Sequence, residues 1–212
     1  MKDARYLCCA VIACAVIVLV SGGCLSVPDS PNSRFYTLQA IGKDQEAPKL
    51  DIAADTVIGI GPVRIPEYLN RPQIVTRDKN GMLTFAQFDR WGDPLDLALT
   101  RLISGNLAVM LPQASFEIFP WNMAIPVNYQ VIADFVQLEA ELNKDLFLAV
   151  QWSIIDAQEN KMMVTKKFEL RKTISPHNYS GLVKALSESC VLLSGEIAKT
   201  AASLPQAADT KK

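Results

Sequence analysis

The stretch VNYQVIADFVQL, residues 127–138, decides the fold class because its apolar and polar side chains alternate as in a half-buried strand. Two further strand-like stretches follow at residues 146–155 (LFLAVQWSII) and 162–171. The turn at 156–160 separates them, and a short polar connection of this kind is typical of a β-hairpin. We therefore expect the last two stretches to pair around this turn, in a sheet that is largely antiparallel or mixed.

Shorter strand-like stretches occur in the first half of the chain. Asn80-Gly81 separates two of them, and this pair favours a tight hairpin turn because both residues tolerate positive φ. Pro62 lies inside another and lacks a backbone N–H, which predicts either an edge position or a bulge there. The predicted strands cover residues 34–38, 56–65, 73–77, 82–88 and 115–119.

Two amphipathic helices are predicted from apolar residues that recur at three and four positions. The first is expected to begin with Asp93 as its N-cap and Pro94 in its first turn, and to run to Met110. The second is expected to begin with Ser175 as its cap and Pro176 in its first turn. Its apolar stripe comprises Leu182, Leu186, Cys190, Leu193 and Ile197.

The order of strands, helix, strands and helix predicts an α+β fold. We expect a single domain at residues 34–204, in which two amphipathic helices cover one face of a mixed, largely antiparallel sheet. Residues 205–212 are polar, and we expect a disordered tail there.

The N-terminus has the pattern of a secretory signal. Lys2 and Arg5 precede an apolar run of about 14 residues, and small residues then lead into Cys24. Such a run is shorter than a membrane-spanning helix, although an uncleaved N-terminal anchor remains the alternative. We expect residues 1–23 to be a lipoprotein signal peptide, and residues 24–33, which are rich in Ser, Pro, Asp and Asn, to be a flexible tether.

Cys24 is the predicted lipidation site because a thiol can accept a diacylglycerol group. Cys14 is a rival, but cleavage there would leave a very short apolar region. Several acyl chains make a durable anchor, so no cofactor is expected beyond covalent diacylglycerol and N-acyl lipid on Cys24. Leu25 follows the cysteine, and by analogy with enterobacterial sorting this predicts an outer-membrane location facing the periplasm. Cys190 is the only cysteine after Cys24, and we expect it to be buried.

Catalytic and metal-binding motifs are not evident. The chain has a net charge of −1 and no basic stripe, so the sequence gives no basis for nucleic-acid binding. His177 is the only histidine, and no Gly-x-Ser-x-Gly elbow accompanies it. Gly59-Ile60-Gly61 lacks the third glycine of a dinucleotide loop. We therefore expect a protein without enzymatic activity and without a metal site.

Two loops contain the residue types that anchor protein interfaces, namely Tyr, Trp and Arg. They lie at residues 63–77 and 88–95. Trp91 is equally consistent with a core position, and the arginines could pair with nearby acidic residues. The candidate interface residues are Arg64, Tyr68, Leu69, Arg71, Arg90 and Trp91.

The run GPVRIPEYLNRPQIVTR at 61–77 and the motif FDRWGDPL at 88–95 resemble the PqiC family, also called ABC-type transport auxiliary lipoproteins. The alternating stretch that begins at Val127 and the C-terminal helix extend the resemblance over nearly the whole predicted domain. The family also carries a lipobox, which here is Val20-Ser21-Gly22-Gly23-Cys24. The chain departs from it at Ser21, where the family usually has leucine.

The resemblance implies a role in lipid transport across the periplasm. Members of this family lie on the inner leaflet of the outer membrane and work with MCE-domain proteins. The expected partners are a PqiB-like MCE-domain protein, an inner-membrane transport component, and other copies of the chain in a homo-oligomeric ring. Such a lipoprotein contributes to envelope integrity by docking or ring formation. The alternative is an envelope assembly or pilot lipoprotein that is unrelated to MCE proteins.

Overall fold

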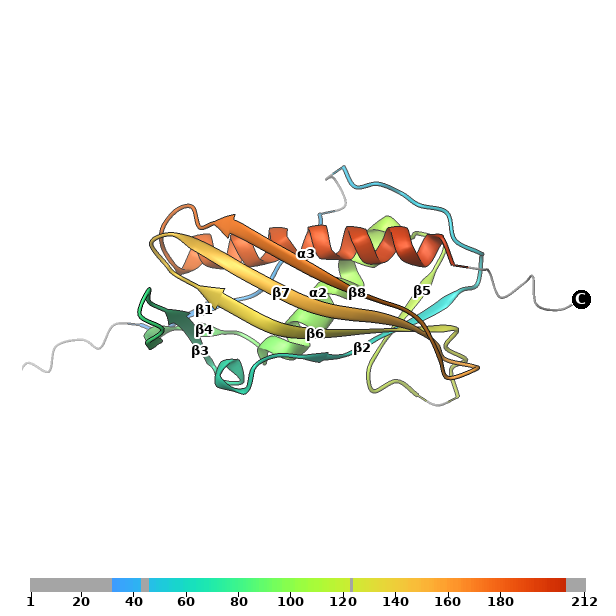
Figure 1. Cartoon of the computed structure of the whole chain (residues 1–212), viewed down its shortest axis with the longest axis horizontal. Helices are drawn as coiled ribbons and strands as arrows, with labels where there is room; N and C mark the ends of the chain where they lie inside the picture. The colour runs from blue at the N-terminus through green and yellow to red at the C-terminus, as the bar shows by residue number, and fades with distance from the viewer. Residues whose placement is uncertain (1–31, 43–45, 123, 205–212) are drawn as a thin grey trace, which may run out of the picture. The chain divides into compact units, whose positions relative to one another are not determined.

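The computed structural model describes residues 32–42, 46–122 and 124–204 (Figure 1). The predicted signal peptide, Cys24, most of the tether and the tail at 205–212 lie outside the described residues. The elements are β1 (Arg34–Tyr36), β2 (Val57–Arg64), the 3₁₀ helix η1 (Glu67–Leu69), β3 (Gln73–Arg77), β4 (Leu83–Trp91), α2 (Leu95–Met110), β5 (Ser115–Ile118), β6 (Tyr129–Ala140), β7 (Asp145–Asp156), β8 (Lys161–Thr173) and α3 (Tyr179–Ala202).

Five strands form the larger sheet in the order β5-β2-β6-β7-β8. The predicted hairpin is present, since β7 pairs with β8 in antiparallel register, and β6 pairs with β7 in the same way. By contrast, β2 runs parallel to both of its neighbours, β5 and β6. The sheet is therefore mixed, as expected for this α+β domain.

The proline in β2 lies in the interior of the larger sheet rather than at its edge. The register between β2 and β6 shifts between Ile60 and Val63, so the predicted bulge is present and contains Pro62. Gly61 has a φ of 114°, a conformation that glycine adopts without strain. Its carbonyl oxygen accepts a hydrogen bond of 2.8 Å from the Gln130 side-chain amide, which satisfies the backbone at the bulge.

The remaining strands form a second, three-stranded sheet in the order β1-β4-β3, where the sequence had predicted a single sheet. The correction has a local cause. The pairing of β3 with β4 shifts register between Gln73 and Val75, and the end of β4, whose Arg90 still pairs with Gln73, takes β1 as a parallel partner on its other edge. We call this three-stranded sheet the small sheet.

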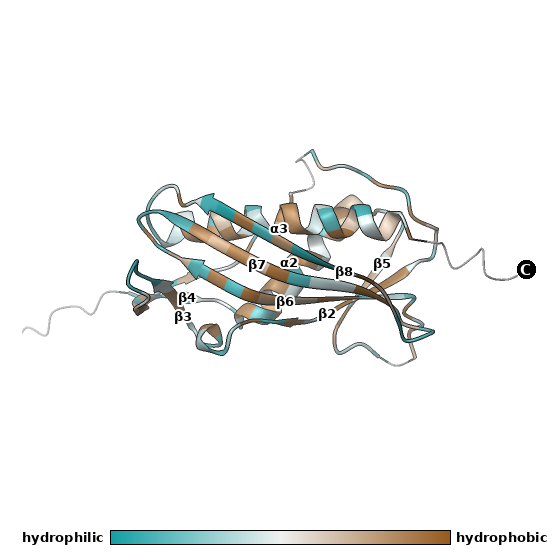
Figure 2. Cartoon of the chain, in the orientation of Figure 1, coloured by the Kyte–Doolittle hydropathy of each residue, from teal (hydrophilic) through white to brown (hydrophobic). Residues whose placement is uncertain are grey.

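Both helices cover one face of the larger sheet, as predicted. Helix α2 packs on β2 and β5, α3 packs on β7 and β8, and the two helices pack on each other. Hydrophobic and hydrophilic residues alternate along the strands in Figure 2, which is the pattern of a sheet with one buried face. Trp152 and Phe135 are among the largest fully buried side chains, and Cys190 is also fully buried, as expected.

Both helix starts differ from the prediction. Pro94, not Asp93, is the N-cap of α2, and the carboxylate of Asp93 instead pairs with Arg101 at 3.2 Å. Helix α3 begins three residues later than Pro176, and its N-cap is Asn178 rather than Ser175. The Asn178 side chain accepts a 2.8 Å hydrogen bond from the Gly181 backbone N–H, which is the bond that an N-cap supplies.

Within the described ranges, no helix combines the length and the apolarity needed to cross a membrane.

Candidate interaction surface

The first strand of the domain is fastened to the small sheet by a buried carboxylate. Asp89 is only 4% exposed. Arg34 donates two hydrogen bonds of 2.8 Å to it, from Nε to Oδ1 and from Nη2 to Oδ2. The Tyr36 hydroxyl donates a third bond of 2.7 Å to Oδ1. Because Arg34 and Asp89 are also register partners, the side chains and the backbone fix the same alignment. We call these three residues the Asp89 latch.

The electrostatics of the latch keep its carboxylate charged. Burial of Asp89 opposes ionisation, but the hydrogen bonds from Arg34 and Tyr36, with the positive charge of Arg34, outweigh it and lower the pKa of Asp89. Burial and the bond to Asp89 raise the pKa of Tyr36, so its hydroxyl remains a donor. Burial and the nearby Asp89 charge also raise the pKa of Tyr179, the first residue of α3. The latch therefore lies where β1, β4 and α3 meet.

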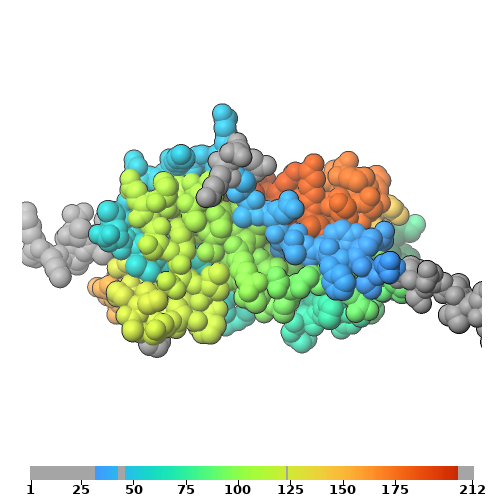
Figure 3. Space-filling view, turned by 180° about the vertical axis from the view of Figure 1, so that it is seen from behind, coloured from blue at the N-terminus to red at the C-terminus, as the bar shows by residue number. Residues whose placement is uncertain are grey.

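The chain beyond β1 continues between the two helices, where it is visible as the blue segment in Figure 3. The Gln39 backbone N–H donates a 3.2 Å hydrogen bond to Ser187 Oγ on α3. The Ile41 backbone N–H donates a 2.9 Å bond to Asn106 Oδ1 on α2. Asn106 is fully buried, and its Nδ2 donates to Ser194 Oγ on α3 at 3.3 Å. One side chain therefore joins the N-terminal segment to both helices.

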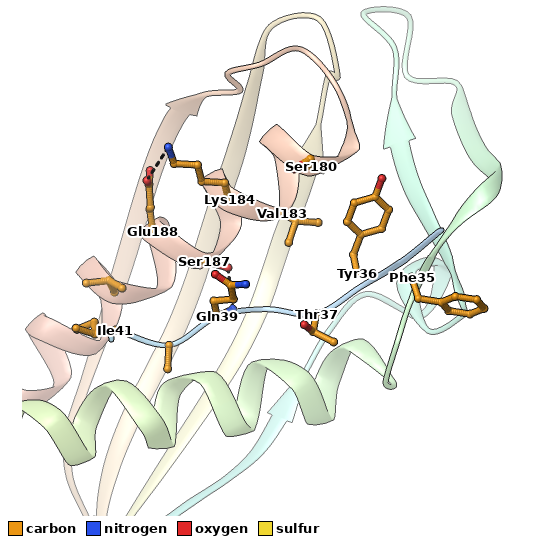
Figure 4. A pocket seen from close by; sticks show the side chains of 12 residues that line it. Phe35, Tyr36, Thr37, Gln39, Ile41, Ser180, Val183, Lys184, Ser187 and Glu188 are labelled. Carbon is orange, nitrogen blue, oxygen red and sulfur yellow. Dashed lines mark hydrogen bonds and ion pairs between the residues drawn. The ribbon is translucent and has the colours of Figure 1, made fainter. Parts of the chain in front are cut away.

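A hollow with a volume of about 510 Å³ lies between this segment and α3 (Figure 4). Lys184 and Glu188 on its helix side form an ion pair at 3.9 Å, and Ser187 is already bonded to Gln39. Phe35 borders the hollow, but its ring points away from the other lining side chains in Figure 4. Two of the polar interactions along the hollow therefore join lining residues to each other, while the Tyr36 hydroxyl is bonded to Asp89.

The structure separates the six candidate interface residues into three groups. Leu69 and Trp91 belong to the hydrophobic core, with exposures of 3% and 7%, so they offer almost no free surface to a partner. The second group comprises Arg64 and Tyr68, at and just after the end of β2. Arg64 is exposed and is the register partner of Asp134 of β6. Tyr68 in η1 is half-buried, and its hydroxyl donates to the Leu138 carbonyl oxygen at 3.4 Å.

The third group comprises Arg71 and Arg90 on the small sheet. The guanidinium of Arg71 lies 4.4 Å from the centre of the Phe85 ring. Arg90 pairs with Gln73 of β3 on one side and with Phe35 of β1 on the other. The Nε atom of Arg90 has no hydrogen-bond partner in the described part of the chain.

The sequence interpretation missed Asp89 and Asn106. Asp89 lies within the predicted loop at residues 88–95, but the neighbouring sequence does not indicate that its partner is Arg34, 55 positions earlier. The sequence signal for Asn106 was the presence of an asparagine among the apolar residues of the predicted first helix. His177 is exposed in the segment before α3, and no group of His, Cys, Asp and Glu able to hold a metal ion occurs among the described residues.

The family assignment follows from comparison with known proteins. A family profile described as "ABC-type transport auxiliary lipoprotein component" matches residues 36–198, which spans the domain from Tyr36 in β1 to Ala198 near the end of α3. The chain belongs to this family. The resemblance to PqiC-type proteins is thereby confirmed, and the family is a transport component rather than a class of enzymes.

Solved structures share the fold of this auxiliary lipoprotein. An uncharacterised protein, 16% identical, superposes with a TM-score of 0.65 over 80% of this chain and 99% of its own. A DUF330 protein from Xanthomonas campestris, 11% identical, superposes with a TM-score of 0.65 over 78% and 93% of the two chains. At such identities the likeness concerns the fold alone. No curated protein matches the chain in sequence.

Proposed function

We propose that this auxiliary lipoprotein is the outer-membrane component of an MCE-type lipid transport system. In this proposal Cys24 carries the lipid, the domain faces the periplasm, and an MCE-domain protein of the PqiB type is the partner, together with an inner-membrane component. The family match over residues 36–198 is the observation that carries the proposal. The signal-like N-terminus and the cysteine at position 24 support it.

The Asp89 latch fits the mechanical demand on an anchored domain. Only nine residues separate Cys24 from Arg34, so any pull on the anchor acts on β1 almost directly. A three-residue strand alone would offer little resistance. The buried carboxylate, with the bonds from Gln39 and Ile41 to the two helices, distributes that load over the whole domain.

Mass spectrometry of the processed chain tests the anchor. We expect an N-terminal peptide that begins at Cys24 and carries diacylglycerol and an N-acyl chain. Cys24→Ser should remove this modification and release the protein from the outer-membrane fraction. An unmodified chain that still contains residues 1–23 would refute the anchor.

Affinity capture from detergent-solubilised membranes tests the partner. Arg64 is exposed and forms no ion pair within the described ranges, and the half-buried Tyr68 lies four residues past the end of β2. We therefore propose that this part of the surface contacts the MCE-domain protein. Arg64→Glu should lower its recovery several-fold, because rim charges control association, whereas Lys161→Glu on the β7–β8 hairpin is the matched control.

Recovery of an envelope assembly complex in place of an MCE-domain protein would favour a pilot lipoprotein instead. An equal loss of MCE-domain protein with Arg64→Glu and with Lys161→Glu would show that Arg64 has no special role in binding the partner. A ring of copies is a further part of the proposal, and chemical crosslinking of intact membranes should then give a ladder that ends at a fixed number of subunits.

A further inference from the structure

Exposed apolar side chains gather on the small sheet. Seven large hydrophobic side chains are strongly exposed within the described ranges, and three of them belong to this sheet or its turn. Phe35 is 67% exposed, Met82 is 65% exposed and Phe85 is 45% exposed. Single exposed apolar residues are ordinary, but a group of them beside polar residues indicates an interaction site.

The register of the small sheet places these residues together. Phe35 of β1, Arg90 of β4 and Gln73 of β3 are cross-strand neighbours and therefore point to the same side. Arg71, two residues before Gln73, covers the Phe85 ring. The opposite side is directed at the core and carries Asp89 and Trp91. We call the side of Phe35, Gln73 and Arg90, with Arg71 and Phe85, the outer face of the small sheet; Met82 directly precedes β4 at the exposed β3–β4 turn.

The composition of this face fits the surface of a lipid bilayer. Phenylalanine is among the apolar side chains that interfacial segments bury at the boundary between headgroups and acyl chains, and guanidinium groups bind phosphate through charge-assisted hydrogen bonds. Neither Arg71 nor Arg90 forms an ion pair with an acidic side chain in the described part of the chain. Lys79 adds a positive charge at the exposed β3–β4 turn, where the Asp78 carboxylate is engaged by the backbone N–H groups of Asn80 and Met82.

The short chain before β1 identifies the small-sheet end of the domain as the end nearest the membrane. Ten residues span at most about 35 Å when fully extended, so a lipid on Cys24 keeps β1 close to the bilayer. In Figure 1 the small sheet lies at one end of the domain, and the β7–β8 turn and the C-terminus of α3 lie at the other. A short tether also raises the effective concentration of lipid headgroups at the surface nearest to it, so weak contacts are sufficient to hold that surface on the bilayer.

We infer that the outer face of the small sheet rests on the lipid headgroups of the membrane that holds the anchor. This inference depends on the proposed function for the anchor at Cys24. It goes beyond that function because it orients the domain: the small sheet lies against the bilayer, and the β7–β8 turn projects into the periplasm.

Two exposed methionines provide a matched test. Met82 lies next to the β3–β4 turn and Met162 next to the β7–β8 turn, with similar exposures of 65% and 55%. Met82→Cys and Met162→Cys are each introduced into the full chain, which the cell then processes and lipidates. Cys190 is fully buried and does not compete for a nitroxide label. The lipidated proteins are reconstituted in vesicles of phosphatidylethanolamine and phosphatidylglycerol.

We expect the label at position 82 to be several-fold less accessible to a water-soluble nickel chelate in vesicles than in detergent, and more accessible to oxygen. The label at position 162 should show no change. Phe35→Ser combined with Phe85→Ser should abolish the shielding at position 82. Both rings are exposed, so the circular dichroism spectrum should be unchanged, and a variant that unfolds is replaced by Arg71→Gln with Arg90→Gln.

Vesicle flotation separates the possible failures. Protein that floats while position 82 remains as accessible as position 162 would overturn the inference and leave the anchor intact. Protein that does not float would overturn the anchor and the inference together. Shielding that occurs only after solubilised envelope proteins are added would assign the outer face to a protein partner and would also overturn the inference.

Discussion

Replacing Asp89 with alanine should weaken the attachment of the N-terminal segment more than any other single change on the small sheet. The substitution removes the acceptor of three hydrogen bonds from Arg34 and Tyr36. A hydrogen bond to a charged group contributes about 1.5–3 kcal/mol, and the half-buried Tyr36 hydroxyl would lose such a bond. Arg34 has a side chain that is 66% exposed and regains water, so its release adds little. We expect a loss of about 2 kcal/mol in the free energy of unfolding.

The loss of stability in Asp89→Ala should depend on pH. The native structure lowers the pKa of Asp89 below its ordinary value of 3.8. The stabilisation by its carboxylate is therefore fully present above the pKa of the unfolded chain and disappears as the pH falls through the lower native value. The difference between wild type and Asp89→Ala should be constant between about pH 7 and 5 and should shrink below about pH 4.

Urea unfolding followed by tryptophan fluorescence measures the global effect, and hydrogen exchange of residues 33–42 measures local detachment. Asp93→Ala is the control, because Asp93 forms an ion pair of 3.2 Å with Arg101 in which both side chains are about half exposed. Such a pair contributes about 0–1 kcal/mol. A cost of Asp89→Ala no greater than that of Asp93→Ala, or an equal effect at pH 7 and at pH 3, would refute a stabilising role of the Asp89 carboxylate.

Three other predictions concern the helices. Asn178→Ala should cost about 1 kcal/mol by removing the N-cap bond of α3, whereas Ser175→Ala should cost almost nothing, and thermal unfolding of the two variants compares them. Asn106→Ala should cost about 2–3 kcal/mol and increase hydrogen exchange at Ile41, because it leaves that buried backbone N–H without an acceptor. Burial raises the pKa of Cys190 to about 12, so a thiol reagent at pH 8 should react with it only after urea is added; rapid labelling of the folded protein would contradict this.

Local patterns were sufficient to predict most of the secondary structure. The helix at Leu95–Met110 ends where the apolar repeat ends, and the strand at Gln73–Arg77 has the predicted bounds. The bulge at Pro62 also follows from the chemistry of one residue. Helix starts were less predictable because several polar residues competed for each cap. Ser175-Pro176 has the preferred residue types, but only the Asn178 side chain reaches the first turn of α3.

Contacts between distant parts of the chain were not predictable from such patterns. The parallel pairing of β1 with β4 brings Phe35 beside Arg90, and no periodicity within either segment encodes it. Trp91 and Leu69 illustrate the same limit, because residue type alone does not distinguish an interface anchor from a core residue in a loop. The Trp91 backbone N–H donates a 2.7 Å hydrogen bond to the Pro72 carbonyl oxygen, so its place depends on a contact between positions that are 19 residues apart.

The position of the Asp89 latch explains why a domain of this kind can keep a fixed orientation on a membrane. A lipid anchor alone restricts only the distance between the domain and the bilayer. Orientation requires that the chain nearest the anchor be rigidly joined to the rest. Arg34 and Tyr36 provide that junction at Asp89, within twelve residues of Cys24, and Asn106 continues it into both helices. If β1 detaches, the small sheet loses the strand that holds its outer face at the bilayer. Asp89→Ala should therefore abolish the shielding at position 82 even while Cys24 remains acylated.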